Sequence, residues 1–233
     1  MITKIPIITV DGPSGVGKGA VSFALAQILQ WNILDSGSLY RTLALAVLRQ
    51  KIDINDEDAL SRCAQSLDIS FNYNEDNNGI SVLFNTEDIS NLIRKELYGS
   101  LASKVAAFKG VRKALLLRQR EFQKPPGLIA DGRDMGTVVF QDATVKIYLS
   151  ASREERARRR YKQLKEKGFS VNLARLSDEI AERDDRDKVR KESPMKPASD
   201  AVIIDTTEVN VKQVVRQITD LAKTAIPELQ HKL

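Results

Sequence analysis

The sequence predicts an α/β fold in which helices flank a parallel sheet, and three patterns in the chain support this prediction. An apolar run over residues 5–10 is typical of a buried strand, and it leads through a glycine-rich loop into a helical pattern. Four more short apolar runs alternate with helical patterns, as the strands of a parallel sheet do. Residues 69–84 interrupt this alternation with a two-residue period, which predicts an inserted antiparallel hairpin.

The glycine-rich loop after the first strand is a P-loop. Its residues are Gly12, Pro13, Ser14, Gly15, Val16, Gly17, Lys18, Gly19 and Ala20. Its glycines let several backbone amides converge on phosphate at the positive end of the following helix, and Lys18 supplies a charge for the outer phosphates. The motif therefore predicts nucleoside triphosphate binding, and its strand and helix context disfavours a glycine-rich turn with a chance lysine. Ala20 stands where a Ser or Thr hydroxyl would face magnesium, so we expect no direct metal ligand from this loop.

Composition limits the possible function classes. With 233 residues, of which 42% are hydrophobic, the chain suffices for one domain with a buried core. No apolar run approaches the roughly 20 residues that a membrane span needs and no signal-peptide pattern is present, so we expect a cytoplasmic protein without a membrane partner. Cys63 is the only cysteine and His231 the only histidine, which excludes a disulfide framework and a histidine-rich metal site.

The net charge of +5 is compatible with nucleic acid binding or with a small anionic substrate. Basic residues concentrate in residues 153–167 and 183–191, where acidic residues are interspersed, and aromatic residues for base stacking are few. This distribution favours phosphate chemistry, so we expect small nucleotides as partners and no nucleic acid.

The second predicted strand, residues 31–34, ends at Asp35 and Ser36, either of which is a suitable N-cap for a helix over residues 39–48. Tyr40 and Arg41 lie in the first turn of this helix. An arginine there is poorly placed for the helix dipole but well placed to bind a phosphate. From the residue pattern alone, an exposed surface arginine is the better supported interpretation of Arg41.

The region between the second and third strands predicts a small inserted subdomain. Helices are predicted over residues 56–67, 89–108 and 111–122, with Ser103 and Arg112 among their polar positions. The hairpin lies between the first and second of these helices, with a polar turn over residues 74–79. Pro125, Pro126 and Gly127 end the region before the third strand, residues 128–130.

The segment after the third strand, residues 131–136, is the second informative motif. Asp131 follows an apolar strand, the usual setting for a carboxylate that accepts from magnesium-bound water. Arg133 is suited to bidentate phosphate binding, and Asp134 to accepting a hydrogen bond from an exocyclic amine such as cytosine N4. A charged turn between strands is the alternative, but it explains less well why two aspartates and an arginine stand between two glycines.

The fourth strand, residues 145–149, precedes a basic helix that begins at Ser152. Arg156, Arg159 and Arg160 share one face of this helix. A solvated helix with Glu154–Arg158 and Glu155–Arg159 ion pairs explains any one of these arginines equally well. The next helix runs from about residue 173 to 190 and carries Arg183, Asp187 and Arg190 on one side. A fifth strand over residues 201–205 and a closing helix from residue 211 are interpreted as scaffold.

Together these motifs resemble bacterial cytidylate kinases. The resemblance rests on the P-loop, on Asp35-Ser36-Gly37 with Tyr40-Arg41, and on Asp131-Gly132-Arg133-Asp134-Met135-Gly136, and it covers nearly the whole chain. It implies a nucleoside monophosphate kinase fold with a five-stranded parallel core in the order 2-3-1-4-5. Within a single kinase domain it implies a core over about residues 1–35, 110–150 and 198–233, a monophosphate-binding subdomain over about 36–109 and a lid over about 151–190.

The resemblance also implies a reaction and the residues that perform it. ATP, with Mg²⁺, would phosphorylate CMP or dCMP, and the protein would be a monomer. CMP would be bound at its phosphate by Arg41, Arg133 and Arg190 and at its ribose by Arg183 and Asp187. The remaining CMP-binding residues would be Ser36, Tyr40, Ser103, Arg112 and Asp134. Arg156 and Arg160 would approach ATP, and Lys18, Arg133, Arg190 and Asp131 would be catalytic, with Asp131 holding Mg²⁺ through water. Ala20 and Gln141, where the family usually has threonine and often proline, depart from its pattern.

Three alternatives stay open at this stage. A P-loop GTPase would share Lys18, but the chain contains no Asn-Lys-x-Asp element for reading guanine. A nucleic-acid-binding protein would use the same positive charge. A UMP-preferring or other nucleoside monophosphate kinase is the nearest competitor, and Asp134 argues against UMP because a uracil carbonyl facing a carboxylate is repelled.

Overall fold

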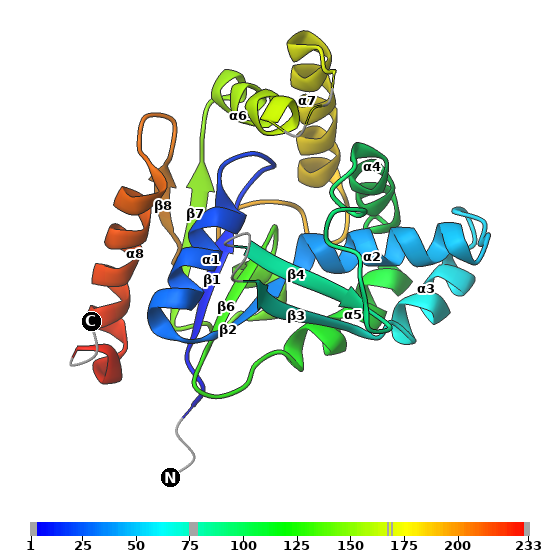
Figure 1. Ribbon diagram of the computed structural model, residues 1–233. Coiled ribbons are helices and arrows are strands. Elements are labelled where there is room, and N and C mark those ends of the chain that lie inside the picture. Colours follow the sequence, from blue (N-terminus) through cyan, green and yellow to red (C-terminus); the bar gives the residue numbers. More distant parts are fainter. Residues whose placement is uncertain (1–3, 75–78, 167, 169, 231–233) are drawn as a thin grey trace.

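A five-stranded parallel sheet forms the centre of the computed structural model, which describes residues 4–74, 79–166, 168 and 170–230 (Figure 1). Its strands are β1 (Ile7–Asp11), β2 (Asn32–Asp35), β6 (Leu128–Gly132), β7 (Val145–Ser150) and β8 (Val202–Asp205). They are arranged in the order β2-β6-β1-β7-β8, and every neighbouring pair is parallel. Because β3 to β5 belong to a second sheet, the core strands counted alone have the predicted order 2-3-1-4-5.

Helices cover both faces of this sheet because alternate side chains of a strand point to opposite sides. On one face Ile8 and Val10 pack with apolar residues of α1 (Lys18–Leu29) and α8 (Val211–Ala225). On the other face Ile7 packs with Met135 and Phe140, from the short π-helix η1 (Met135–Val139) and its C-cap. The carboxyl ends of the strands are left for the loops that carry the polar motifs. A single-turn helix, η2 (Pro227–Leu229), follows α8.

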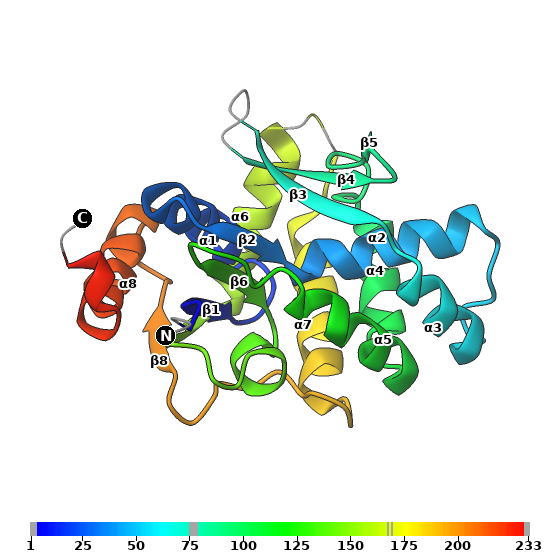
Figure 2. The same ribbon diagram turned by 90° about the horizontal axis from the view of Figure 1, so that it is seen from below.

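The region between β2 and β6 has an apolar core of its own. It contains the helices α2 (Ser36–Arg49), α3 (Glu57–Gln65), α4 (Glu96–Val105) and α5 (Lys109–Arg120), and the antiparallel strands β3 (Ile69–Asn74), β4 (Gly79–Phe84) and β5 (Glu87–Asp88). Figure 2 shows β3 and β4 beside α2, on the far side of the molecule from α8. Leu43, Leu60, Val82 and Leu115 are buried together in this core. The predicted hairpin is thus confirmed, although residues 75–78 of its turn lie outside the described residues.

Two details of this region differ from the prediction. The two-residue strand β5 adds a third strand to the hairpin. The helix predicted over residues 89–108 is wrong in its first part, because α4 begins only at Glu96. Residues 89 and 90 are held by β4 instead: the Ile89 amide donates to the Val82 carbonyl (3.0 Å), and the Ser90 hydroxyl accepts from the Val82 amide (2.8 Å).

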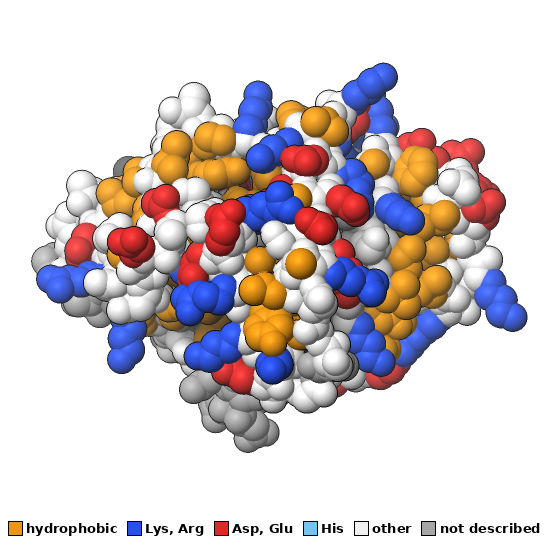
Figure 3. Space-filling view, turned by 90° about the horizontal axis from the view of Figure 1, so that it is seen from above, with side chains coloured by type: hydrophobic (Ala, Val, Ile, Leu, Met, Phe, Trp, Pro, Cys, Tyr) orange, Lys and Arg blue, Asp and Glu red, His pale blue; other side chains and the backbone are white. Residues whose placement is uncertain are grey.

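Two packed helices, α6 (Arg153–Glu166) and α7 (Leu173–Val189), lie over the carboxyl end of the sheet (Figure 1). They coincide with the region expected to form a lid, and that assignment stays a prediction. Figure 3 views this side of the molecule and shows basic and acidic side chains interspersed, without a continuous basic surface. Among the described residues, none of the helices is both long enough and apolar enough to cross a membrane.

Candidate active site

The P-loop wraps closely against its neighbours, and glycine is required at two of its positions. Gly12 has a φ of 144°, and a Cβ there would lie 2.2 Å from the Leu149 carbonyl oxygen of β7. Gly15 has a φ of 82°, and a Cβ there would lie 3.1 Å from the Cβ of Arg156 in α6. Both φ values favour glycine because a Cβ clashes with the backbone in this region. The loop therefore fits tightly between the edge of the sheet and α6.

Lys18 begins α1 and folds back over its own loop. Its Nζ donates hydrogen bonds to the carbonyl oxygens of Gly12 and Pro13, both at 2.9 Å. Burial, and then the nearby positive charge of Arg133, lower the pKa of Lys18 to about 7. The loop thus presents a buried lysine whose charge is incompletely compensated, a setting that favours an anionic ligand.

Three aspartates lie at or next to the carboxyl ends of neighbouring strands beside this loop, and their hydrogen-bond partners differ. Asp35 caps α2 by accepting from the Ser38 amide (2.9 Å) and lies opposite Asp131 in the sheet register. Asp11 accepts from two backbone amides after β6. Within the described part of the chain, no group donates a hydrogen bond to the Asp131 carboxylate, and burial raises the pKa of Asp131 to about 7. Asp131 is therefore the carboxylate with free lone pairs, 3.8 Å from where a Cβ on Gly19 would lie.

Five charged residues form a second, buried group, which we call the arginine–aspartate cluster: Arg112, Arg133, Asp134, Asp187 and Arg190. Arg112 donates to Asp134, and the Nε of Arg133 donates to Asp187 at 3.0 Å. Arg190 lies 3.8 Å from an oxygen of Asp134 and 3.9 Å from one of Asp187. Burial alone would raise the pKa of Asp187, but Arg133 and the other nearby arginines lower it below its usual range. The fold thus brings together site residues that the sequence places far apart, on α5, after β6 and at the end of α7.

Polar groups around this cluster are incompletely satisfied. The Tyr40 hydroxyl is buried and lacks a hydrogen-bond partner among the described residues, and its ring lies under the Arg112 guanidinium at 5.8 Å. The Nε of Arg183 likewise lacks one, and burial, then the charges of Arg133 and Arg41, lower the pKa of Arg183 to about 9. Ser103 donates a long hydrogen bond of 3.4 Å to Asp187. Buried groups without partners are uncommon in folded proteins and indicate a ligand site.

Ser36 and Arg41 are both held in place at the start of α2. The Ser36 hydroxyl donates to the Gln119 side chain of α5 at 2.7 Å. Arg41 donates to the Ile93 carbonyl at 2.7 Å and packs against Gly99, where a Cβ would lie 2.6 Å from a guanidinium nitrogen. Interpretation of Arg41 as a plain surface arginine is therefore wrong. No sequence pattern pointed to Gln119, because its contact with Ser36 depends on how α2 and α5 pack.

The arginines predicted to share one face of α6 reach two parts of the protein, the P-loop for Arg156 and Arg159 and the start of α4 for Arg160. Arg156 donates to the Ser14 carbonyl of the P-loop (3.0 Å) and forms a buried ion pair with Asp184 of α7. Arg159 donates to the Val16 carbonyl (3.4 Å), and Arg160 to Glu96 (3.0 Å). Of the two ion pairs expected along the helix, Glu155–Arg159 is present at 2.8 Å, whereas Arg158 pairs with Glu155 and not with Glu154 in the described residues. α6 is thus not a solvated helix held only by ion pairs along its own length, because its arginines also contact the P-loop, α4 and α7.

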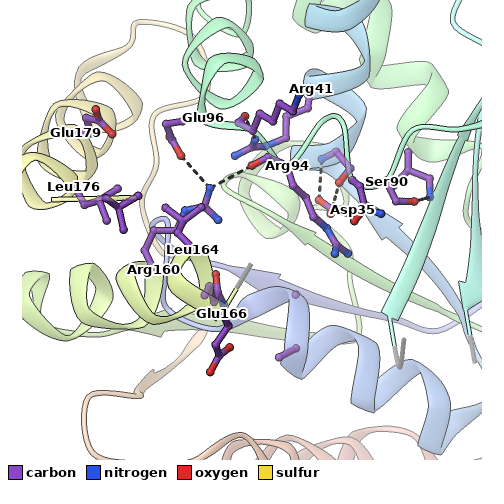
Figure 4. A pocket seen from close by; sticks show the side chains of 18 of the residues that line it. Asp35, Arg41, Ser90, Arg94, Glu96, Arg160, Leu164, Glu166, Leu176 and Glu179 are labelled. Atoms are coloured by element: carbon purple, nitrogen blue, oxygen red, sulfur yellow. Dashed lines mark hydrogen bonds and ion pairs between the residues drawn. The ribbon is translucent and has the colours of Figure 1, made fainter. Parts of the chain in front are cut away.

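An open cleft of about 1620 Å³ lies beside the P-loop, between the start of α1, α2, β4 and the helices α6 and α7. Its lining includes Gly19, Ala20, Asp35, Arg41 and Arg160. Figure 4 shows Arg160 pointing toward Glu96 and the backbone of Arg94, with Arg41 beside them. Arg94 and Glu96 were not predicted as site residues, because a helix was expected over residues 89–108 where Arg94 lies in a loop before α4.

Comparisons with known proteins agree with the motifs. A family model described as cytidylate kinase matches residues 8–224. A cytidylate kinase from Yersinia enterocolitica is 55% identical over 217 residues, which are 93% of this chain and 94% of that protein. One from Pectobacterium atrosepticum is 54% identical over 96% of this chain and 98% of its own length. Among solved structures, a gluconokinase from Sinorhizobium meliloti covers 95% of this chain and 94% of its own at 15% identity with a TM-score of 0.47, a likeness too weak for any conclusion.

Proposed function

The chain belongs to the cytidylate kinase family, and on this premise we propose that it transfers the γ-phosphoryl group of ATP to CMP or dCMP, giving ADP and CDP or dCDP. It is an enzyme of the nucleoside monophosphate kinase class. The observation that carries the proposal is the arginine–aspartate cluster beside the P-loop, because it supplies a site for a second anionic nucleotide next to the first.

ATP would bind through the P-loop. Backbone amides of residues 12–20 would surround its phosphates, and Lys18 would exchange its two carbonyl partners for oxygens of the outer phosphates. Arg156 already contacts the loop at Ser14, whereas Arg160 reaches the loop before α4. Both would lie near ATP if α6 and α7 form the proposed lid, whose closure would exclude water and limit ATP hydrolysis.

CMP would bind on the other side of the transferring phosphoryl group. Asp134 would accept a hydrogen bond from the exocyclic amine of cytosine, with Ser103 and Arg112 beside it. Arg183 and Asp187 would bind the ribose, and Arg41, Arg133 and Arg190 the phosphate, with Ser36 and Tyr40 completing the site. The unpaired Tyr40 hydroxyl and Arg183 Nε support this assignment, since a nucleotide would supply their missing partners.

This reaction needs no proton-abstracting residue. A phosphate monoester is largely ionised at neutral pH, so an oxygen of CMP can attack ATP directly. The contribution of the protein would be to bring two anions into line and to neutralise charge on the transferring group with Lys18, Arg133 and Arg190. The absence of a usable histidine in the motifs is therefore of no consequence for catalysis.

The residues present fit Mg²⁺ held through water. Asp131 offers a buried carboxylate without a hydrogen-bond donor among the described residues, and Ala20 offers no oxygen, so the ion would be held by water and phosphates with Asp131 outside its first shell. The described residues contain no cluster of three or more acidic, histidine or cysteine side chains that could hold a metal alone. When bound with ATP, Mg²⁺ supplies positive charge to the phosphates.

A coupled assay of ADP release across a panel of monophosphates tests the proposal. With ATP and Mg²⁺, we expect CMP and dCMP to support turnover, and UMP to do so at least about tenfold less well in kcat/KM. ADP release that is independent of any monophosphate would indicate a P-loop nucleotidase instead. A preference for UMP would make the protein a different nucleoside monophosphate kinase. Tight, steeply salt-dependent RNA binding with no ADP release would indicate a nucleic-acid-binding protein.

A further inference from the structure

The segment that carries Arg133 and Asp134 lies between β6, which ends at Gly132, and η1, which begins at Met135. Asp134 has φ −146° and ψ 23°, so it belongs to neither element. Backbone hydrogen bonds of the sheet reach only as far as Gly132, which is paired with Asp11 in the register of β1 and β6. The position of the next residues therefore depends on other contacts.

The side chain of Asp11 provides the closest of these contacts. Asp11 is the last residue of β1 and is 4% exposed. One carboxylate oxygen accepts from the Met135 amide at 2.8 Å, and the other accepts from the Gly136 amide at 2.8 Å. Both oxygens are thus used as acceptors, and these two bonds favour the ionised carboxylate against the burial that raises the pKa of Asp11 to about 7. A Cβ at Gly136 would lie 3.4 Å from Asp11 and 3.0 Å from Thr9, so glycine permits this approach.

Asp11 also precedes the P-loop directly. The next residue, Gly12, accepts a hydrogen bond from Lys18 Nζ at 2.9 Å through its carbonyl. A short series of covalent and hydrogen bonds therefore runs from Lys18 through Gly12 and Asp11 to the amides of Met135 and Gly136. Asp11, Asp35 and Asp131 lie at the carboxyl ends of β1, β2 and β6. Among these three described residues, Asp11 is the one whose carboxylate connects the P-loop strand with residues 133–136.

We propose that Asp11 is a positioning residue that holds Arg133 and Asp134 against the P-loop, and thereby determines how well the enzyme distinguishes CMP from UMP. The inference rests on the proposed function, in which Asp134 reads the base and Arg133 binds the acceptor phosphate. A shift of residues 134–136 by a fraction of an ångström would move the Asp134 carboxylate relative to the base, because Asp134 is bonded directly to Met135. Asp11 itself touches neither nucleotide in this scheme.

Asp11→Asn tests the proposal with little change in shape. The amide offers one acceptor oxygen, and its NH₂ group faces a backbone N–H, so one of the two hydrogen bonds is lost. The matched control is Thr9→Val, two residues earlier on the same face of β1, because the Thr9 hydroxyl is buried without a hydrogen-bond partner in the described structure. We expect Asp11→Asn to lower the CMP:UMP ratio of kcat/KM about fivefold or more, and Thr9→Val to change it less than about twofold.

Two results separate this inference from the proposed function. If Asp134→Ala changes the CMP:UMP ratio but Asp11→Asn does not, base reading by Asp134 stands and the role of Asp11 is wrong. If neither variant changes the ratio, both assignments fail. An equal loss for CMP and UMP with a lower melting temperature would also overturn the proposal, because Asp11 would then be merely structural.

A measurement on the unaltered protein keeps the inference testable if Asp11→Asn does not fold. The amide protons of Met135 and Gly136 should exchange slowly with solvent in an NMR experiment on the full chain without nucleotide, since both are bonded and buried. The amide of Arg133, for which no acceptor is described, is the internal comparison. Exchange of Met135 and Gly136 as fast as that of Arg133 would overturn the proposal.

Discussion

The P-loop and the arginine–aspartate cluster bind phosphate-bearing ligands in the proposed reaction, yet they are built in opposite ways. The P-loop is one continuous stretch of chain, and its shape depends on glycine backbone angles and carbonyl contacts. The cluster is assembled from α5, the end of β6 and α7, and side-chain ion pairs hold it together. One site is a local property of the sequence and the other a property of the tertiary fold.

The two regions also differ in how their charge is balanced. Burial and nearby Arg133 lower the pKa of Lys18 to about 7, since carbonyl groups compensate only part of its charge. Burial would lower the pKa of Arg133 as well, but Asp187 and Asp131 raise it above the usual value. The P-loop thus lacks an anion that ATP would supply, whereas the three arginines of the cluster already share two aspartates, so CMP must rearrange existing ion pairs. Four predictions test this contrast.

The largest effect is expected at Lys18, whose buried ammonium group donates to the Gly12 and Pro13 carbonyls of the P-loop. Lys18→Met should reduce kcat about 1000-fold or more, because it removes the charge closest to the transferring phosphoryl group. The coupled ADP assay measures this loss. The melting temperature should hold or rise, since a buried charge is exchanged for an apolar side chain of similar length. Retention of a tenth of the activity would contradict the assigned role.

Arg133→Ala should reduce kcat by about 100-fold while raising KM for CMP much less. Arg190, which lies 3.9 Å from Asp187, is unchanged in this variant, so part of the binding site for the CMP phosphate remains. The lost guanidinium acts mainly on the charge that develops during transfer. Steady-state kinetics with varied CMP separates the two constants, and Arg133→Lys serves as the control that keeps the charge but not the fork geometry. A rise in KM at unchanged kcat would instead assign Arg133 to simple binding.

Selectivity should change more modestly when Asp134 is altered. Asp134→Ala should lower the CMP:UMP ratio of kcat/KM about tenfold, because it removes both the acceptor for the cytosine amine and the repulsion of the uracil carbonyl. Arg112 loses its ion pair with Asp134 in this variant and keeps only neutral acceptors in the described structure, so the melting temperature should fall. Asp134→Asn retains an acceptor oxygen, so its CMP:UMP ratio should lie between that of the unaltered protein and that of Asp134→Ala. An unchanged ratio in the alanine variant would remove the base-reading assignment.

The contrast between the two regions explains what the sequence could predict. Gly12, Gly15 and Lys18 follow from local spacing, because a strand, a glycine-rich turn and a helix N-terminus form a phosphate site without help from distant residues. The strand order of the core followed from the family resemblance. The residues themselves predicted only which segments are strands and that they pair in parallel.

Motif and helix spacing pointed to Arg133, Asp134, Asp187 and Arg190, and the resemblance added a role for Arg112. The pairing of these residues could not be predicted. Arg112 and Asp134 are 22 positions apart, and Arg133 and Asp187 are 54 apart. Spacing along the chain does not predict contacts between residues so far apart in the sequence. Gln119 and Arg94 were missed for the same reason, as their neighbours are set by how α5 and the loop before α4 pack. The early part of the predicted helix over residues 89–108 failed because β4 binds residues 89 and 90.

The smallest predicted effect concerns pH and the charge of Lys18. With its pKa near 7 in the free protein, Lys18 is mostly neutral at pH 8. Phosphate oxygens stabilise the protonated form, so its pKa is higher in the complex and binding takes up a proton. The affinity for a non-hydrolysable ATP analogue should therefore fall between pH 7 and 8, by less than about tenfold. Calorimetry at pH 8 in two buffers of different ionisation enthalpy measures the uptake directly.

Two variants identify the group that takes up this proton. Lys18→Arg keeps a positive charge that does not titrate in this range, so the uptake should disappear. Asp131 and Asp11, whose pKa values burial raises to about 7, are carboxyl groups that could take up a proton beside phosphate, and Asp131→Asn should leave most of the uptake in place. Uptake that persists in Lys18→Arg but vanishes in Asp131→Asn would transfer the titration to the carboxylate. Asp131, and not Lys18, would then be the group beside the P-loop whose charge changes when ATP binds. The difference in charge balance between the P-loop and the arginine–aspartate cluster would then depend on Asp131.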